Sequence, residues 1–291
     1  MSKFLCFLLA ISFGHSALNA TDSIPPIHII SYNIQLLPRW IAHLKHKPMQ
    51  RVPFIAREMI RENPDIIVFQ EAFSKPCNKK LIALLKPHFP YIAGPANEKR
   101  GFKLSSGVLI LSKTPLEILE TIQFDTCEKE DCMARKGAIL VQTSIRNQSL
   151  QILGTHMEAG GTAELKTSQF TQIKHLVEKH QKPGIAQFLC GDFNIRQTSD
   201  LYTKMLGDLA MYDSHPSGKL KYSADHALND MNPIDPNERS LIDYIFLRNV
   251  SPTDWQVERE IMRYQAEWHK KRRDLSDHFA IKARITIPAT P

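Results

Sequence analysis

Short runs of apolar and β-branched residues recur along the chain and predict strands. Runs of this length, bounded by Gly, Pro, Asn and other polar residues, are typical of strands rather than helices. In Ile66-Ile67-Val68-Phe69 every position is apolar, which predicts a strand that is buried on both faces. The predicted strands are residues 28–32, 65–69, 107–111, 138–145, 150–154, 185–190, 241–247 and 278–287.

Two segments between these runs carry apolar residues at helical spacing. Residues 50–62 end before Asn63-Pro64, and residues 164–180 end before Pro183-Gly184, which are pairs that stop a helix. Residues 138–145 and the run from Leu150 predict a hairpin that turns at residues 146–149. Because helices and strands mix without a clear linker, we expect one α/β domain. The polar stretch 214–240 is too long for a simple connection, which indicates a functional or self-ordered loop.

Polar side chains stand at the ends of several predicted strands. Most of them follow their strand, whereas Ser276-Asp277-His278 opens the last one. Ligand-binding and catalytic groups of α/β sheets gather beyond strand ends. The candidate residues are Asn33, Glu71, His156, Asp192, Asn194, Asp277 and His278.

These residue types suit metal-assisted hydrolysis. Asn, Asp and Glu oxygens bind hard cations such as Mg²⁺, and histidines transfer protons near neutral pH. Each short motif alone occurs by chance in many proteins, and a lone histidine at a strand end is more often structural. The specific signal is their conjunction, because all of them lie at strand ends of one chain.

The series resembles the endonuclease/exonuclease/phosphatase superfamily. It runs in family order through Asn33, Glu71, Gly154-Thr155-His156, Gly191-Asp192-Phe193-Asn194, Asp243-Tyr244 and Ser276-Asp277-His278. The resemblance implies a DNase I-like fold, an α/β four-layer sandwich of two packed mixed β-sheets flanked by helices. It covers nearly all of a single catalytic domain at residues 21–291. Within the superfamily the chain looks most like bacterial secreted neutral sphingomyelinases, through residues 31–38, 106–113, 131–137 and 153–159.

The resemblance also implies a metal site. Mg²⁺, with Mn²⁺ or Co²⁺ as substitutes, would be held by Glu71 with help from Asn33 and would bind the scissile phosphate. Asp192 would lie near the nucleophile or a second metal ion. His278 stands beside these residues in the implied metal site.

Further roles follow from the same resemblance. His278 would take a proton from the attacking water, with Asp277 next to it. His156 and Asn194 would stabilise the transition state by hydrogen bonds. Asp243 would orient a histidine and fix its tautomer.

The favoured substrate is sphingomyelin, which would be cleaved to ceramide and phosphocholine by a monomeric enzyme in peripheral contact with a membrane. Three alternatives stay open: a secreted nuclease that binds nucleic acid, a phosphoinositide phosphatase, and an inactive lipid-binding relative. In the family a membrane-inserting hairpin lies between the Asp243 and Asp277 elements. Here that span holds Trp255, Tyr264 and Trp268, which fit either interfacial aromatics or the packed face of a helix.

The charge and the N-terminus bear on partners and location. The net charge of +7 favours anionic partners, and residues 269–273 form the strongest basic run, either a solvated loop or a phosphate-attracting one. Residues 1–20 have Lys3, an apolar run and Ala20, which predict a secretory signal peptide. We therefore expect a secreted protein, extracellular or periplasmic.

The cysteines fit an oxidising compartment. Without Cys6, four cysteines remain and allow three full pairings. Cys127 and Cys132 lie close together in a polar stretch, so a disulfide between them is plausible. Cys190 ends an apolar run and reads as a buried free thiol.

Overall fold

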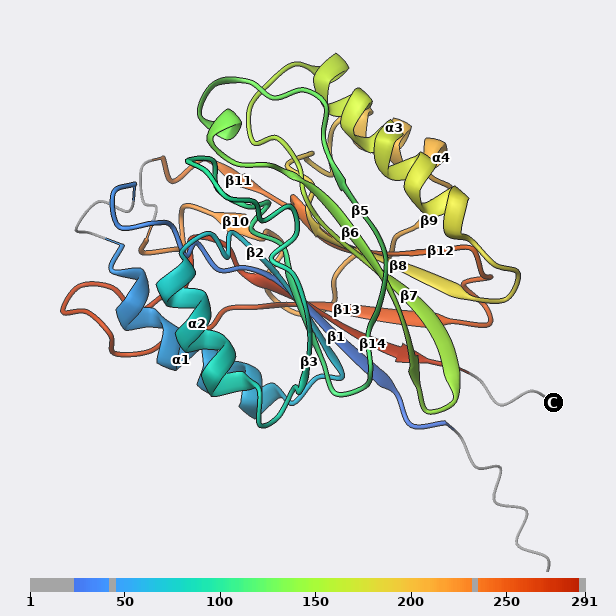
Figure 1. Ribbon diagram of the computed structural model, residues 1–291, viewed down its shortest axis with the longest axis horizontal. Coiled ribbons are helices and arrows are strands. Elements are labelled where there is room, and N and C mark those ends of the chain that lie inside the picture. Colours follow the sequence, from blue (N-terminus) through green and yellow to red (C-terminus); the bar gives the residue numbers. More distant parts are fainter. Residues whose placement is uncertain (1–23, 42–45, 232–234, 288–291) are drawn as a thin grey trace, which may run out of the picture.

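Two mixed β-sheets pack face to face with helices on their outer faces (Figure 1). The structure is a computed structural model that describes residues 24–41, 46–231 and 235–287. The predicted signal peptide, residues 1–20, lies outside the described residues. The four-layer α/β sandwich predicted from the sequence is confirmed.

The first sheet has six strands in the order β13-β14-β1-β2-β4-β3. Strands β1 and β2 are parallel, and the remaining neighbours are antiparallel. Helices α1 (Pro48–Glu62) and α2 (Lys75–Leu85) cover its outer face (Figure 1). The strands are β1 (Ile27–Asn33), β2 (Ile66–Gln70), β3 (Tyr91–Ala93), β4 (Leu109–Ser112), β13 (Gln256–Met262) and β14 (Ala280–Thr286).

The second sheet has six strands in the order β5-β6-β7-β8-β12-β9. Its outer face carries α3 (Ala163–His180) and α4 (Asp200–Asp208). A separate pair, β10 (Ala224–Asp225) and β11 (Arg239–Ser240), and a 3₁₀ turn, Lys129–Met133, stand apart from both sheets. The strands are β5 (Glu117–Gln123), β6 (Gly137–Ile145), β7 (Gln148–His156), β8 (Ala186–Asp192), β9 (Met211–Tyr212) and β12 (Asp243–Arg248).

The alternation of side chains along the strands divides the core into two parts. Ile29 and Val68 point between the sheets and join the core that also contains Leu189 of the second sheet. Their neighbours Ile30 and Ile67 point outward to α1 and α2. Because successive strand residues face opposite sides, a continuous apolar run fills both cores at once.

Most of the predicted elements are found. Every predicted strand overlaps an observed one, and both predicted helices exist. The predicted hairpin turns at Arg146 and Asn147, both with positive φ, as a two-residue turn of this hand requires. The elements not predicted from the sequence are α2, α4, β5, β13 and the short strands β3, β9, β10 and β11.

Both interpretations of the aromatic segment before Asp277 are wrong. Trp255, Tyr264 and Trp268 are buried, and each exposes 7% or less of its surface. The segment is no helix, because β13 occupies Gln256–Met262 and a single bridge joins Gln265 to Asp274. The aromatic rings pack inward because this span closes the edge of the first sheet. The basic run 269–273 lies in the turn between the bridged residues.

The cysteine predictions hold. Cys127 and Cys132 form a disulfide with their Cα atoms 5.2 Å apart. Cys190 is a buried free thiol, and so is Cys77. Among the residues that the structure describes, no helix has the length and apolarity needed to cross a bilayer.

Candidate active site

The predicted polar residues meet where strands of the two sheets end. Asp192, the last residue of β8, pairs in register with His156 on one side and with Asp243 on the other. Asn33 ends β1, and Glu71 follows β2. Two like charges directly opposite each other on neighbouring strands repel. Asp192 and Asp243 therefore need a cation or a proton between them.

Asn33 links the two halves of the site. Its Nδ2 donates to Glu71 Oε1 and to Asp192 Oδ2, each at 3.1 Å, and so joins carboxylates from the two sheets. Its Oδ1 accepts a hydrogen bond from the Gln35 backbone N–H at 3.2 Å. Asn33 is fully buried, so its amide is fixed in place by these contacts.

The carboxylates of this cluster are poorly neutralised. Burial, and then the charge of Asp277, raise the pKa of Glu71 to about 7. Burial, and then the charge of Asp243, raise the pKa of Asp192 to about 7. Desolvation and like charge both disfavour the ionised form of a carboxylate. The positive charge of a bound cation would oppose both effects.

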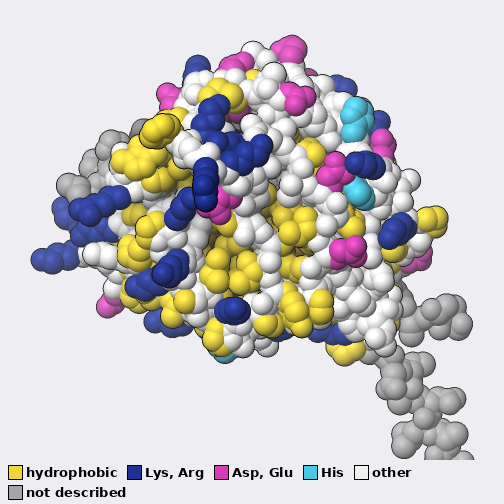
Figure 2. Space-filling model, in the orientation of Figure 1, with side chains coloured by type: hydrophobic (Ala, Val, Ile, Leu, Met, Phe, Trp, Pro, Cys, Tyr) yellow, Lys and Arg dark blue, Asp and Glu magenta, His cyan; other side chains and the backbone are white. Residues whose placement is uncertain are grey.

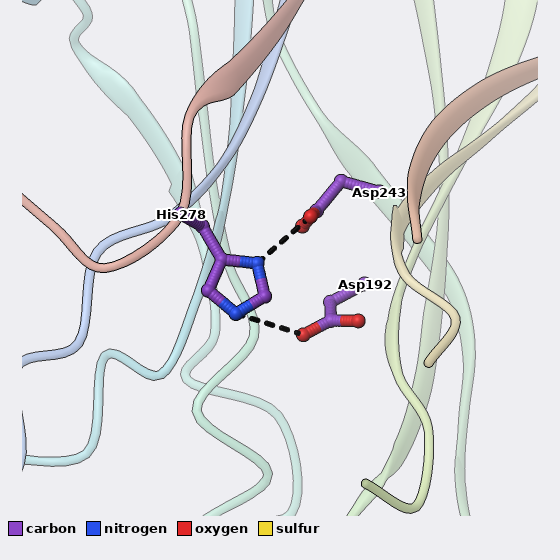
Figure 3. Close-up of side chains that lie close together, drawn as sticks. All are labelled: Asp192, Asp243 and His278. Carbon is purple, nitrogen blue, oxygen red and sulfur yellow. Dashed lines mark hydrogen bonds and ion pairs between the residues drawn. The ribbon is translucent and has the colours of Figure 1, made fainter. Parts of the chain in front are cut away.

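His278 lies between two aspartates (Figure 3). Its Nδ1 is 2.8 Å from Asp243 Oδ2, and its Nε2 is 3.9 Å from Asp192 Oδ2. Burial lowers the pKa of His278, but the charges of Asp243 and Asp192 outweigh it and raise the pKa well above its usual value. The two aspartates thus favour the protonated form of the His278 ring.

His156 has the opposite environment. Its Nε2 is 3.2 Å from Lys136 Nζ and 3.7 Å from Asp192 Oδ2. Burial, with the charges of Lys136 and His278, lowers the pKa of His156 well below its usual value. Because the ammonium can only donate, the neutral ring accepts at Nε2 and carries its proton on Nδ1.

Asp277 and Asn194 have separate hydrogen-bond partners at the site. Asp277 does not contact the ring of its neighbour: its Oδ2 accepts from Gln35 Nε2 at 2.5 Å, and its charge acts on Glu71. Asn194 Nδ2 donates to the carbonyl of Met157 at 3.1 Å, and its backbone N–H donates to Asp192 Oδ1 at 2.9 Å. The structure thus brings Asp243, rather than Asp277, to His278.

The donor set fits a divalent cation. One ligand atom each from Asp192, Asp243 and His278 lie within 4.8 Å of one another. Asp243 Oδ1 is buried and has no hydrogen-bond partner among the described residues. A second oxygen group, Glu71 with Asn33, adjoins them through Asp192. Carboxylate and amide oxygens are the ligands that hard cations prefer.

Three residues missed as site members hold the predicted ones. Lys136 is 5% exposed, and its Nζ also binds Asp131 Oδ1 at 2.7 Å and the Met157 carbonyl at 2.9 Å. Gln35 bonds Asp277, and the fully buried Arg51 donates to the carbonyls of Ile34, Gln35 and Leu275. The one available signal was that Lys136 and Gln35 fall within stretches that resemble the family.

The long polar segment 214–240 supports the site, as its length suggested. Ser223 Oγ accepts hydrogen bonds from the backbone N–H groups of Ile242 and Asp243. Asn229 Nδ2 donates to the carbonyl of Ser276 at 2.9 Å. The segment therefore fixes the entry into β12 and the chain just before Asp277.

The backbone at the site is strained. Gln35, Glu71 and Asn194 have φ values of 47°, 55° and 51°, which L-residues adopt only at an energetic cost. Such strain persists where surrounding contacts fix the conformation, and it concentrates at functional sites. Gly191 meets another constraint, since a Cβ there would lie 2.2 Å from the carbonyl oxygen of Thr155. This close approach accounts for the glycine before Asp192.

A pocket of about 440 Å³ opens beside the cluster. Asn194 and His278 line it, together with Lys166, Arg196 and His226. Lys166 Nζ donates to the carbonyl of Asn194 at 2.6 Å. Glu238 also lines the pocket and pairs with Arg196 at 3.2 Å, so Lys166 is the lining cation that lies next to the cluster.

A family model, described as the endonuclease/exonuclease/phosphatase family, matches residues 30–278. The chain belongs to this family. The match begins in β1 and ends at His278, so it contains every residue of the cluster. The resemblance in family order along the sequence is therefore confirmed.

Relatives within the family include bacterial proteins named sphingomyelinase C and phospholipase C. Sphingomyelinase C 2 of Leptospira interrogans is 27% identical over 79% of this chain. The alignment spans 41% of that protein, so the chain matches less than half of its length. Sphingomyelinase C of Bacillus cereus is 22% identical over 96% of this chain and 95% of its own.

Solved structures confirm the fold. Beta toxin of Staphylococcus aureus superposes with a TM-score of 0.79 at 22% identity, over 88% of this chain and 99% of that one. A beta toxin variant with bound magnesium ions gives a TM-score of 0.78 at 22% identity, over 89% of this chain and 99% of that one. At this identity the likeness establishes the shared architecture.

Proposed function

We propose that this chain is a secreted, Mg²⁺-dependent phosphodiesterase that hydrolyses sphingomyelin to ceramide and phosphocholine. The observation that carries the proposal is the buried cluster of Glu71, Asp192 and Asp243 around Asn33 and His278. Its acids repel one another unless a cation is bound, and a cation in that place meets a substrate phosphate. The sphingomyelinase relatives support the choice of substrate. The sequence of residues 1–20 supports secretion.

Glu71, Asn33 and Asp192 are the residues that would hold Mg²⁺, and Mn²⁺ or Co²⁺ would replace it. Bound there, the cation would polarise the phosphate and neutralise developing charge. To present an oxygen, the Asn33 amide would turn over and give up its two carboxylate bonds. The charge of a bound cation would oppose the burial and the like charges that raise the pKa values of Glu71 and Asp192.

His278 would move the proton. With Nδ1 donating to Asp243, its Nε2 is the atom that faces Asp192 and would accept a proton from the attacking water. Asp243 would stabilise the imidazolium that forms, as a buried carboxylate does for other catalytic histidines. Once Asp192 shares its charge with a cation, less stabilisation remains, and the pKa of His278 falls toward the range of a base at neutral pH.

The neutral His156 and the charged Lys136 would stabilise the charge that develops on the phosphate. Both are buried, so their interactions are stronger than they would be in water. Asn194 stands on the same side, at the mouth of the pocket. Asp277 would hold Gln35 and, with Glu71, would add negative charge to the metal side.

Purified protein assayed with Mg²⁺ on sphingomyelin vesicles, plasmid DNA and a phosphoinositide tests the proposal. We expect release of phosphocholine, and little product from the other two substrates. Glu71→Gln should lower the rate more than about 10³-fold, because the cation leaves with it. Glu117→Gln, on the exposed strand β5, is the matched control and should be fully active.

Two results would contradict this proposal. Absence of phosphocholine release with every divalent cation would remove the sphingomyelinase assignment, and cleavage of DNA would replace it with a nuclease. Near-normal activity of Glu71→Gln would show that the metal ligands are misassigned.

A further inference from the structure

The loop between β3 and β4 presents an aromatic side chain to solvent. Phe102 is 104% exposed, more than any other large hydrophobic side chain that the structure describes. Lys99, Arg100 and Lys103 surround it in sequence, and all three are exposed. Among the described residues none of the three forms an ion pair with a carboxylate. The loop therefore carries uncompensated positive charge around one apolar tip.

The exposure of Phe102 is built into the fold. The next residues are held by the chain before β6: Leu104 N–H donates to the Met133 carbonyl at 2.8 Å, and Arg135 Nη1 donates to the Lys103 carbonyl at 2.8 Å. Gly101 has a φ of +127°, a conformation that turns the chain at the tip. Met133, 40% exposed, thus adjoins the loop as a second apolar side chain.

Hydrophobic and basic side chains lie next to one another at this corner of the molecule. In Figure 1 the segment before β4 passes beside the 3₁₀ turn at the upper left. Figure 2, in the same orientation, shows yellow and dark blue side chains together there. A surface of this kind, an apolar tip framed by Lys and Arg, is suited to an anionic bilayer.

The loop is also tied to the candidate active site by two contacts. At its end near β4, the Gly107 carbonyl accepts from the Ala72 N–H at 2.9 Å, directly after Glu71. Near its tip, the Lys103 carbonyl accepts from Arg135, which precedes Lys136, whose Nζ is 3.2 Å from His156 Nε2. The exposed Phe102 and the site therefore share one edge of the molecule.

We propose that Phe102, Met133, Lys99, Arg100 and Lys103 form a docking surface for an anionic membrane. Phe102 and Met133 insert at the boundary between headgroups and acyl chains, and the three cations bind lipid phosphates and carboxylates. Because the loop is anchored next to Glu71 and Lys136, docking brings the site to the plane of the lipid phosphates. This surface goes beyond the proposed function, since binding to a bilayer requires no hydrolysis.

Co-sedimentation with phosphatidylcholine vesicles, with and without phosphatidylserine, tests the surface without any substrate present. We expect the wild-type chain to bind the phosphatidylserine vesicles more tightly, and salt to weaken this binding. Phe102→Ser should weaken it about tenfold. Replacing Lys99, Arg100 and Lys103 by Gln should weaken it about fivefold for each charge removed.

Tyr212→Ser is the matched control. Tyr212 is 49% exposed on β9, and it pairs with Leu247, at the end of β12 opposite to Asp243. The Tyr212→Ser variant should bind vesicles like the wild type. Phe102 makes no core contact, so thermal unfolding of Phe102→Ser should match the wild type and exclude a folding defect.

Three results would overturn the proposal. The first is unchanged vesicle binding by Phe102→Ser, and the second is an equal loss of vesicle binding in Tyr212→Ser. The third is displacement of the vesicles by duplex DNA whose own binding depends on Phe102, which would make the surface a nucleic-acid site. An assay of phosphocholine release distinguishes a failure of this docking surface from a failure of the proposed enzymatic activity. If the chain releases no phosphocholine but binds vesicles through Phe102, only the proposed activity fails.

Discussion

The regions around His156 and His278 use the same side chain in opposite ways. His156 lies beside the Lys136 ammonium, and its pKa is lowered; His278 lies between Asp243 and Asp192, and its pKa is raised. Both rings approach the same Asp192 oxygen, at 3.7 Å and 3.9 Å. Burial disfavours the charged form of both rings. At His156 the Lys136 charge adds to the effect of burial, whereas at His278 the charges of Asp243 and Asp192 outweigh it.

The largest effect should come from removing the negative neighbour of His278. Asp243→Asn keeps the shape but loses the charge that stabilises the imidazolium, and it can present the wrong hydrogen-bonding group to Nδ1. We expect kcat to fall about 10⁴-fold, as for other carboxylates that orient a catalytic histidine. Steady-state kinetics at saturating Mg²⁺ measure this. Asp254→Asn, in an exposed turn, should leave kcat unchanged, and a small effect of Asp243→Asn would contradict the role of Asp243.

Removing the positive neighbour of His156 should have a smaller effect. Lys136→Gln takes away a charge that lowers the pKa of His156, so this pKa should rise toward its usual value. Loss of one buried electrostatic group should lower kcat about 10²-fold. An NMR titration of the His156 ring, compared with Lys166→Gln, measures the pKa shift directly. An unmoved pKa would mean that burial alone keeps His156 neutral.

The carboxylates predict how the metal-free protein responds to pH. The pKa values of Glu71 and Asp192 are raised from 4.5 and 3.8 to about 7 in the folded state. Between about pH 4 and about pH 7 the folded chain thus binds more protons than the unfolded chain. The free energy of unfolding should therefore fall as the pH rises through this range. Saturating Mg²⁺ should restore about 2 kcal/mol above pH 7.

Thermal and denaturant unfolding with EDTA or Mg²⁺ measure this dependence. Glu71→Gln removes one of the two groups, so the metal-free variant should lose less stability than the wild type over the same pH range. It should also gain little from Mg²⁺. Equal pH profiles for the variant and the wild type would show that Glu71 is not buried against a like charge.

The smallest change in activity should follow loss of the disulfide. The Cys127–Cys132 loop carries Asp131, which bonds Lys136 Nζ at 2.7 Å and the Ala159 N–H at 2.7 Å. Replacing both cysteines by Ser should lower the free energy of unfolding by about 2 kcal/mol, as expected for a short loop. The kcat should change less than about tenfold. A loss as large as that of Lys136→Gln would mean that the disulfide itself positions Lys136.

The sequence predicted the interior of the sheets better than their edges. In β2, four consecutive residues, Ile66 to Phe69, are apolar because the strand is buried on both faces. The edge strands β5 and β13 alternate polar and apolar residues and have many charges, as in Gln-Val-Glu-Arg-Glu-Ile-Met, so no apolar run marked them. Helix α2 was missed because only Leu81, Leu85 and two further positions of this short helix are fully buried.

The candidate residues were predicted better than their pairings. The resemblance named all the acids and histidines now found together, including Asp243 as the partner of a histidine. The resemblance placed Asp277 next to His278. In the structure the His278 ring lies against Asp243 instead. Asp277 and His278 lie in a bend before β14, where no regular periodicity tells from the sequence which way each side chain points. The Asp243–His278 contact joins residues 35 positions apart and depends on the packing of the two sheets.

The position of β14 bears on how the chain folds. This strand follows every other strand of its sheet in sequence, yet it lies inside the first sheet, between β13 and β1. Until β14 docks, β1 has an unpaired edge and His278 is not held at the candidate site. A folding intermediate without β14 thus has an open strand edge that can pair with other chains. Docking of β14 closes that edge and assembles the candidate site in a single step.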